Sequence, residues 1–158
     1  MKTCPYCGSM VENREDHHEC SFCEMVISFE DVQEDGKRKN VMPDHQPDIE
    51  DVHKTTPALM TYSTIELLYL LKIARSERFK TYESRRSILR ALNHREDAYY
   101  RQGEKELYEQ YNYWTRKCFV LENLVRDRQG YFPTKLSASY LEYLLFKIEK
   151  SSKTMFPY

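Results

Sequence analysis

LYEQYNYWTRKCFVLENLV, residues 107–125, decides the fold of the chain because it has the clearest periodic pattern in it. Its apolar residues are separated by alternating steps of four and three, the spacing of a helical face that packs along a second helix. The residues on this face are Leu107, Tyr111, Trp114, Cys118, Leu121 and Val125. We therefore predict a long helix with a heptad-like seam, in which the cysteine is a small buried side chain.

Local signals place this helix at about residues 95–128. Gly130 stands where a C-cap glycine belongs. Asn93 and Glu96 match an N-cap residue and the acid that follows it in a capping box. Gly103 lies inside the predicted helix and lowers its stability by roughly 1 kcal/mol relative to alanine, so a break is an alternative there.

A second long helix precedes this one along the chain. Ser63 and Glu66 form an S-x-x-E capping box, and residues 63–92 contain neither glycine nor proline. The apolar residues at near-helical spacing are Ile65, Leu68, Phe79, Tyr82 and Leu89. Two helices of similar length joined by a short turn fold back as an antiparallel hairpin, and a third helix at residues 137–150 can cover its open apolar face.

CPYCGSMVENREDHHECSFC, residues 4–23, places four cysteines in two CxxC pairs. Zinc prefers a tetrahedral shell of thiolates, and two CxxC turns joined by a short hairpin present four sulfurs to one point. The predicted ligands are Cys4, Cys7, Cys20 and Cys23. Because about 28 residues cannot bury a stabilising core, we expect one structural zinc ion to contribute much of the folding free energy.

Other roles for these cysteines fit less well. Four cysteines can also hold an iron–sulfur cluster. A thiol–disulfide site is disfavoured because no βαβ pattern surrounds either CxxC pair. A catalytic zinc needs an open coordination position, which four cysteines leave closed. The adjacent His17 and His18 are therefore expected to face solvent or to pack on the surface of this region.

The same stretch resembles a zinc ribbon. The resemblance rests on CPYCG (residues 4–8), on CSFC (residues 20–23) and on the β-prone run that follows. It implies a small β fold with the four cysteines as zinc ligands and Gly8 as the glycine of the first turn, whereas Glu24 stands where the second turn commonly has a glycine. Zinc ribbons are frequent in proteins of transcription, replication and RNA handling, but the acidic character of this stretch opposes direct phosphate contact.

Together these patterns predict a mainly α protein with a small β zinc ribbon, a long antiparallel helical hairpin and a C-terminal covering helix. The predicted domains are a zinc ribbon at residues 1–29, an acidic linker at residues 30–60 and an α-helical domain at residues 61–158. We predict a linker at residues 30–60 because the segment is rich in acidic residues, contains three prolines and shows neither a helical nor a strand period.

The composition narrows the class of protein. With 41% apolar and 31% charged residues, the chain is unlike a disordered protein. It contains no uninterrupted apolar run of about 18 residues and no apolar N-terminal region, so neither a membrane span nor a secretory signal is expected. Five cysteines are an odd number for a disulfide scaffold, which favours metal binding in the cytoplasm.

Residues 72–95 concentrate positive charge, and they are the strongest argument in the sequence for nucleic-acid binding. The basic residues are Lys72, Arg75, Arg78, Lys80, Arg85, Arg86, Arg90 and Arg95. On a helix, several of them share a stripe that can follow a phosphate backbone. The alternatives are a solvated face, pairing with the acidic linker, an acidic protein partner, or pairing with acids of the next helix such as Glu104, Glu106 and Glu109.

We therefore predict a non-enzymatic regulatory protein that acts on nucleic acid or on the transcription or replication machinery, with residues 72–95 as the contact surface. The alternative is a protein–protein interaction adaptor that uses the aromatic helical surface and binds no nucleic acid. No enzyme is expected, because the sequence lacks a phosphate-binding glycine loop and the G-x-S-x-G and H-E-x-x-H motifs. The seam at residues 107–125 also offers a homodimer contact.

Overall fold

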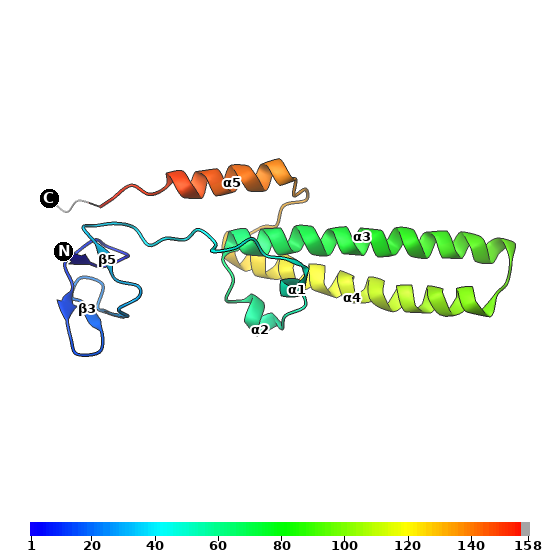
Figure 1. Cartoon of the computed structure of the whole chain (residues 1–158), viewed down its shortest axis with the longest axis horizontal. Helices are drawn as coiled ribbons and strands as arrows, with labels where there is room; N and C mark the ends of the chain where they lie inside the picture. Colours follow the sequence, from blue (N-terminus) through cyan, green and yellow to red (C-terminus); the bar gives the residue numbers. More distant parts are fainter. Residues whose placement is uncertain (156–158) are drawn as a thin grey trace. The chain divides into compact units, whose positions relative to one another are not determined.

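The helices α3 (Thr64–His94) and α4 (Ala98–Gln129) form the long hairpin. In the computed structural model, which describes residues 1–155, they lie side by side and antiparallel (Figure 1). Both are unbroken, and α4 continues through Gly103. The strands are confined to a small N-terminal region. The predicted mainly α fold, with an antiparallel hairpin and a small β region, is therefore confirmed.

The other elements are short and belong to two compact units. β1 (Lys2–Thr3) pairs with β5 (Gln33–Glu34), and β2 (Glu12–Asn13), β3 (His18–Cys20) and β4 (Met25–Ile27) form an antiparallel three-stranded sheet. The remaining helices are α1 (Ile49–Val52), α2 (Thr56–Leu59) and α5 (Ala138–Lys150). One unit comprises residues 1–42 and the chain from residue 143 onward, and the other comprises residues 43–142. Among the helices of residues 1–155, none is long and apolar enough to cross a membrane.

The outer ends of the hairpin follow the predicted capping signals. The Ser63 side chain accepts the Glu66 N–H at 3.3 Å, and the Glu66 carboxylate accepts the Ser63 N–H at 2.7 Å, which completes a capping box. Gly130 has a φ of 84°, and its N–H donates to the carbonyl of Arg126 at 2.8 Å. Glycine reaches this left-handed conformation without a steric penalty, so it ends α4.

The turn between the long helices lies at residues 95–97, later than predicted. α3 continues through Asn93 to His94, so the prediction that a new helix is capped at Asn93 is wrong. The N-cap of α4 is Asp97, whose carboxylate accepts the N–H of Tyr99 at 2.8 Å. Asparagine and aspartate both cap helices well, so the local sequence does not distinguish Asn93 from Asp97 as the N-cap of α4.

The core of the hairpin lies toward its open end, where α3 begins and α4 ends. The large side chains of α3 and α4 that are fully buried include Leu67, Leu70, Leu71, Leu121 and Val125. In the predicted seam, Trp114 and Cys118 are also buried, whereas Leu107 and Tyr111 are only half-buried. Burying one such leucine contributes about 1.5–3 kcal/mol, so this end holds the two helices together.

The predicted apolar stripe of α3 is buried only at its start. Ile65 and Leu68 are buried, but Phe79, Tyr82 and Leu89 are 64%, 47% and 40% exposed. Periodicity shows which residues share a helix face, but burial needs a second element on that face. The short helix α1 packs against α3, and the buried residues of α3 lie mostly in its first half, so the second half keeps exposed aromatic side chains.

Residues 43–62, most of which belong to the predicted acidic linker of residues 30–60, are folded onto the hairpin. Val52 and Leu59 are fully buried. His53 Nδ1 lies 2.6 Å from the Tyr113 hydroxyl, a contact between residues 60 positions apart. Local composition does not reveal contacts at this separation, so the sequence pattern alone indicated a linker here.

A buried carboxylate joins α1 to the start of α3. Asp51 is 7% exposed, and its Oδ1 accepts hydrogen bonds from Lys54 Nζ at 2.6 Å and from the Tyr62 hydroxyl at 2.7 Å. Its Oδ2 accepts the backbone N–H of Asp48 at 3.0 Å. The hydrogen bonds from Lys54 and Tyr62 hold the pKa of Asp51 well below its usual range, so this carboxylate stays charged in mildly acidic solution.

Asp51→Asn is expected to lower the free energy of unfolding by about 2 kcal/mol at neutral pH, because the amide loses the charge-assisted bond to Lys54. The pKa of Asp51 is lowered in the folded state. Its contribution is therefore complete above the ordinary carboxyl pKa of about 4 and decreases as the pH falls below it. Urea unfolding followed by circular dichroism should show the difference between wild type and variant shrinking from about pH 7 to about pH 3. A difference in unfolding free energy that stays constant over this pH range would contradict the stabilising role of the Asp51 charge.

The segment after α5 returns to the β region. The Met155 N–H donates to the Gly36 carbonyl at 2.8 Å, and Arg38 Nε donates to the Lys153 carbonyl at 2.6 Å. Gly36 has a φ of 70°, and a Cβ at this position would overlap the Met155 carbonyl, so only glycine fits. A helix at the predicted position is confirmed as α5, and Leu141 in its first turn is fully buried, whereas the covering of the hairpin by this helix stays a prediction.

Candidate metal centre

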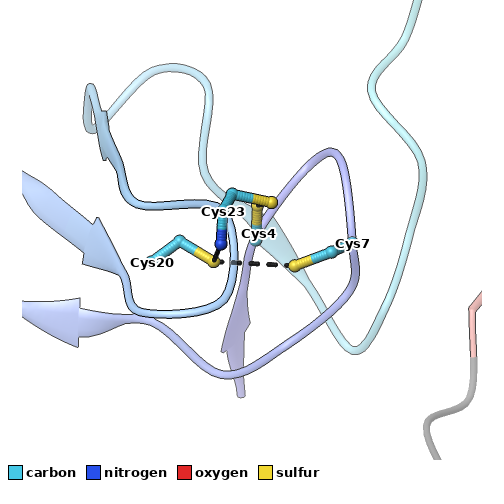
Figure 2. Close-up of side chains that lie close together, drawn as sticks. All are labelled: Cys4, Cys7, Cys20 and Cys23. Atoms are coloured by element: carbon cyan, nitrogen blue, oxygen red, sulfur yellow. Dashed lines mark hydrogen bonds between the residues drawn. The ribbon is translucent and has the colours of Figure 1, made fainter.

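Four cysteine side chains from two turns of the β region point toward one another (Figure 2). The Sγ atoms of Cys4, Cys7, Cys20 and Cys23 all lie within 4.8 Å of one another. Cys7 and Cys20 are 3.5 Å apart, and Cys4 and Cys23 are 3.9 Å apart. A tetrahedral shell with metal–sulfur bonds of about 2.3 Å has sulfur–sulfur edges of about 3.8 Å. The predicted ligands are thus together, at spacings that fit a metal ion.

Each CxxC pair lies in a tight turn. In the first turn the Gly8 N–H donates to the Cys4 carbonyl at 2.9 Å, and in the second the Cys23 N–H donates to Cys20 Sγ at 3.4 Å. The chain leaves both turns through a left-handed residue, Gly8 with a φ of 74° and Glu24 with a φ of 54°. Glu24 therefore has the conformation of the glycine that is common at this place, and the two turns have similar backbones.

Glu24→Gly is expected to stabilise the metal-bound region by up to about 1 kcal/mol, because glycine removes the strain of the left-handed conformation. Glu24→Val makes the same change in charge and is expected to destabilise the region, since a branched Cβ is disfavoured at positive φ. A chelator titration of both variants measures the midpoint of metal loss. Midpoints in the opposite order, or identical ones, would contradict the strain at this position.

Burial and the close approach of the thiols shift the pKa values of Cys4, Cys7 and Cys23. Burial raises the pKa of Cys4, and hydrogen bonding to the other thiols, Cys7 first, raises the pKa of Cys23 to about 12. Burial also acts to raise the pKa of Cys7, but hydrogen bonds from Ser9 and the neighbouring thiols outweigh it and lower the value to about 6. Four thiolates at these distances repel one another, and a divalent cation between them removes that repulsion.

Neither adjacent histidine belongs to the thiol cluster. The His17 ring bonds to Asp16 at 2.5 Å and to Glu19 at 3.3 Å, and these hydrogen bonds, that of Glu19 first, raise its pKa. His18 is 5% exposed, and its ring meets the ring of Phe29 edge-on at 5.0 Å. His17 is thus on the surface, whereas His18 is packed more deeply than the sequence predicted.

All five cysteines are free thiols. Cys118 lies in the hairpin seam and is 1% exposed. Burial raises its pKa, so the thiol stays protonated at neutral pH. Cys118 is therefore the small buried side chain that the seam predicted.

The eight basic residues predicted as a nucleic-acid contact fall into two groups. Four pair with acids of the same unit: Arg75 with Glu122 at 2.8 Å, Lys80 with Glu77 at 2.6 Å, Arg85 with Glu104 at 2.7 Å, and Arg86 with Glu83 at 3.5 Å. Within residues 1–155, no ion pair involves Lys72, Arg78, Arg90 or Arg95. Pairing between the two long helices, one of the predicted alternatives, holds for Arg75 and Arg85.

Two hollows on the hairpin share Arg78. One, of about 440 Å³, is lined by Arg78, Thr115, Arg116, Phe119, Val120 and Glu122. The other, of about 360 Å³, is lined by Arg75, Arg78, Phe79, Tyr82 and Tyr111. The sequence reasoning missed Arg116 and Phe119. The sequence feature that could have revealed this surface is Phe119 itself. It lies on the polar side of an amphipathic helix, where a phenylalanine is expected to be exposed.

In the part of the chain that the structure describes, the thiol cluster is the one group of Cys, His, Asp and Glu side chains close enough to hold a metal ion. A set of four thiolates selects zinc, copper(I) or an iron–sulfur cluster over the hard cations. No family model, curated protein or solved structure matches the chain.

Proposed function

We propose that the chain is a non-enzymatic cytoplasmic adaptor, in which a zinc ribbon is joined to a helical hairpin that binds a partner protein. The observation that carries the proposal is the exposure of Phe79 on α3 and Phe119 on α4, 64% and 67%, which line two hollows that share Arg78. Large apolar side chains gathered on a folded surface are typical of protein-binding surfaces. This is the function that the sequence indicated as the alternative.

In this proposal the metal is zinc and its role is structural. The four sulfurs have the spacing of a tetrahedral shell, and a shell of four cysteines leaves no open position for substrate. Among the described residues, the buried apolar cluster here consists of Cys4, Cys20 and Ile27, with Cys7, Val11, Cys23 and Val32 partly buried against it. Such a core is too small to stabilise a fold by itself, so metal binding is the main source of folding free energy in this region.

Nucleic-acid regulation is the second candidate. It is favoured by Lys72 and Arg90, which are 18 residues apart and therefore lie on the same side of α3. Against it, residues 43–142 contain 16 Lys and Arg and 15 Asp and Glu, a net charge of only +1. Sequence-independent affinity for phosphates increases with net positive charge, which is close to zero for this unit.

A pull-down from a nuclease-treated lysate of the source cells tests the adaptor. We expect the zinc-loaded chain to retain a protein partner after nuclease treatment. Phe79→Ser with Phe119→Ser should lose the partner, and Arg86→Glu with Arg90→Glu, the control pair, should keep it. Retention that depends on the arginines and not on the aromatic residues would overturn the adaptor.

Direct binding of labelled oligonucleotides tests the second candidate. Single- and double-stranded probes are titrated with the zinc-loaded chain at about 50 and about 200 mM salt, where affinity from phosphate contacts falls steeply. The adaptor predicts no binding at either concentration. Binding at low salt that disappears in Arg86→Glu with Arg90→Glu would establish nucleic-acid contact through α3.

A homodimer through residues 107–125 stays a prediction, and fewer residues of the seam are exposed for it than the sequence pattern indicates. Trp114, Cys118 and Leu121 are buried within the single chain, so this part of the seam is already covered. A second copy would have to use exposed residues such as Tyr108 and Phe119. Sedimentation of the wild type and of Phe119→Ser measures whether such a dimer forms.

A further inference from the structure

We propose that the hairpin binds an acidic amphipathic helix of a partner protein, which covers Phe79, Tyr82 and Phe119 and pairs its carboxylates with Arg78 and Arg116. This inference rests on the proposed adaptor function and specifies the chemistry of the partner. The five side chains are called the docking face below. All of them line the two hollows that share Arg78.

The shape of the docking face matches a helix. Phe79 and Tyr82 are three residues apart on α3, and Arg116 and Phe119 are three residues apart on α4, so each pair projects from one side of its helix. The two helices run side by side (Figure 1), so the docking face combines about one turn of α3 with about one turn of α4. A partner helix placed along it would add a third helix to the hairpin, with anchors at successive turns.

The aromatic side chains provide the apolar part of the affinity. Phe79, Tyr82 and Phe119 are 64%, 47% and 67% exposed. Covering a phenylalanine side chain contributes about 1.5–3 kcal/mol at most, part of which offsets the loss of motion on binding. Three such side chains within one face are enough for micromolar affinity when charge pairs accompany them.

Arg78 decides the charge of the partner. It lies between the two hollows, is half-buried and forms no ion pair within residues 1–155. Its neighbour Arg75 differs, since it binds Glu122 at 2.8 Å and the Pro133 carbonyl at 2.7 Å. Any occupant that covers both hollows also covers the Arg78 guanidinium, and burying an unpaired charge is costly. The occupant must therefore bring a carboxylate.

The exposed Arg116 is a second positive charge on the docking face, and it also favours an occupant with carboxylates. It lies one helical turn before Phe119 and also forms no ion pair within the described residues. A second copy of this chain would bring its own Arg78 and Arg116 to the contact, and like charges across an interface oppose binding. An acidic helix instead pairs with both arginines, so a partner protein is favoured over self-association through this face.

Panning of a displayed peptide library tests the inference. The library contains amphipathic helices with random charges beside a fixed apolar stripe, and the bait is the zinc-loaded chain. We expect acidic helices to be enriched and their affinity to fall about tenfold or more in Phe79→Ser with Phe119→Ser. Enrichment of basic or neutral helices, or of none, would overturn the inference.

Charge reversal provides the decisive control. Arg78→Glu with Arg116→Glu should shift the enriched peptides from acidic to basic, because the sign of the docking face is reversed. Arg90→Glu with Arg95→Glu makes the same change in net charge outside the docking face and should leave the acidic preference intact. An equal shift in both variants would show non-specific attraction and refute the site. Circular dichroism confirms that each variant keeps its helices.

The result separates this inference from the function on which it rests. If the pull-down retains a partner through the aromatic residues but the enriched helices are not acidic, the adaptor stands and the partner chemistry is wrong. If neither experiment depends on Phe79 and Phe119, both fail. Competition of the enriched peptides by a single-stranded oligonucleotide at low salt would instead assign the docking face to nucleic acid.

Discussion

Cys20→Ser is expected to abolish tight metal binding and to unfold the β region of residues 1–34. Cys20 is 2% exposed, its Sγ accepts the Cys23 N–H at 3.4 Å, and it forms the small core together with Cys4 and Ile27. Serine removes a thiolate ligand and leaves a hydroxyl that binds zinc poorly. Binding of a structural zinc contributes about 10–16 kcal/mol to folding. Because the loss of one ligand removes much of this free energy, we expect the region to unfold.

The measurements are metal content by mass spectrometry and the dispersion of amide signals in NMR spectra. The wild type should contain one zinc ion per chain, and the variant should contain none and lose the dispersed signals of residues 1–34. Cys118→Ser is the matched control, since that thiol is buried in the hairpin seam and far from any predicted ligand in sequence. It should keep its zinc. A Cys20→Ser protein that retains stoichiometric metal would refute the four-cysteine shell.

Leu121→Ala is expected to destabilise the hairpin by about 3 kcal/mol. Leu121 is fully buried in the seam of α4. Replacing it with alanine loses the transfer free energy of the side chain and leaves a cavity, which together cost about 2–5 kcal/mol in comparable cores. Since small domains are stable by only about 5–15 kcal/mol, this is a large share of the total.

Urea unfolding followed by tryptophan fluorescence measures this effect directly. Trp114 is the single tryptophan of the chain, is 8% exposed and lies in the same seam, so its emission reports the hairpin. Phe119→Ala, on the exposed side of the same helix, is the control and should change the free energy of unfolding by less than about 0.5 kcal/mol. Similar effects of the two substitutions would show that the seam does not form the core.

Features with a local cause could be predicted from the sequence. Ser63 and Gly130 mark helix ends because capping involves only the nearest residues, and the thiol cluster follows from the spacing of two CxxC pairs. Glu24 stands where the second turn commonly has a glycine, and the structure shows that the glutamate adopts the left-handed conformation there. These features depend on a few consecutive residues.

Features that need a distant partner could not be predicted in this way. The periodic stripe of α3 places Leu68 and Phe79 on the same face of the helix. Leu68 is buried, whereas Phe79 is 64% exposed, because only one end of the hairpin is covered. The basic stripe likewise appeared uniform, but the register between α3 and α4 brings Glu104 to Arg85. A charge pattern along one helix cannot show which of its members meet an acid on another.

The sequence by itself therefore determined the two long helices, their outer caps and the four thiols of the metal centre, since each is encoded by spacing within a short segment. Tertiary structure alone decided that residues 43–62 fold onto the hairpin, that Gly36 lies against Met155, and that Arg78 lies near exposed aromatic side chains with no ion pair among residues 1–155. The physical reason is the same in each case. Burial and ion pairing are properties of two surfaces, and the second surface comes from residues far away in the chain.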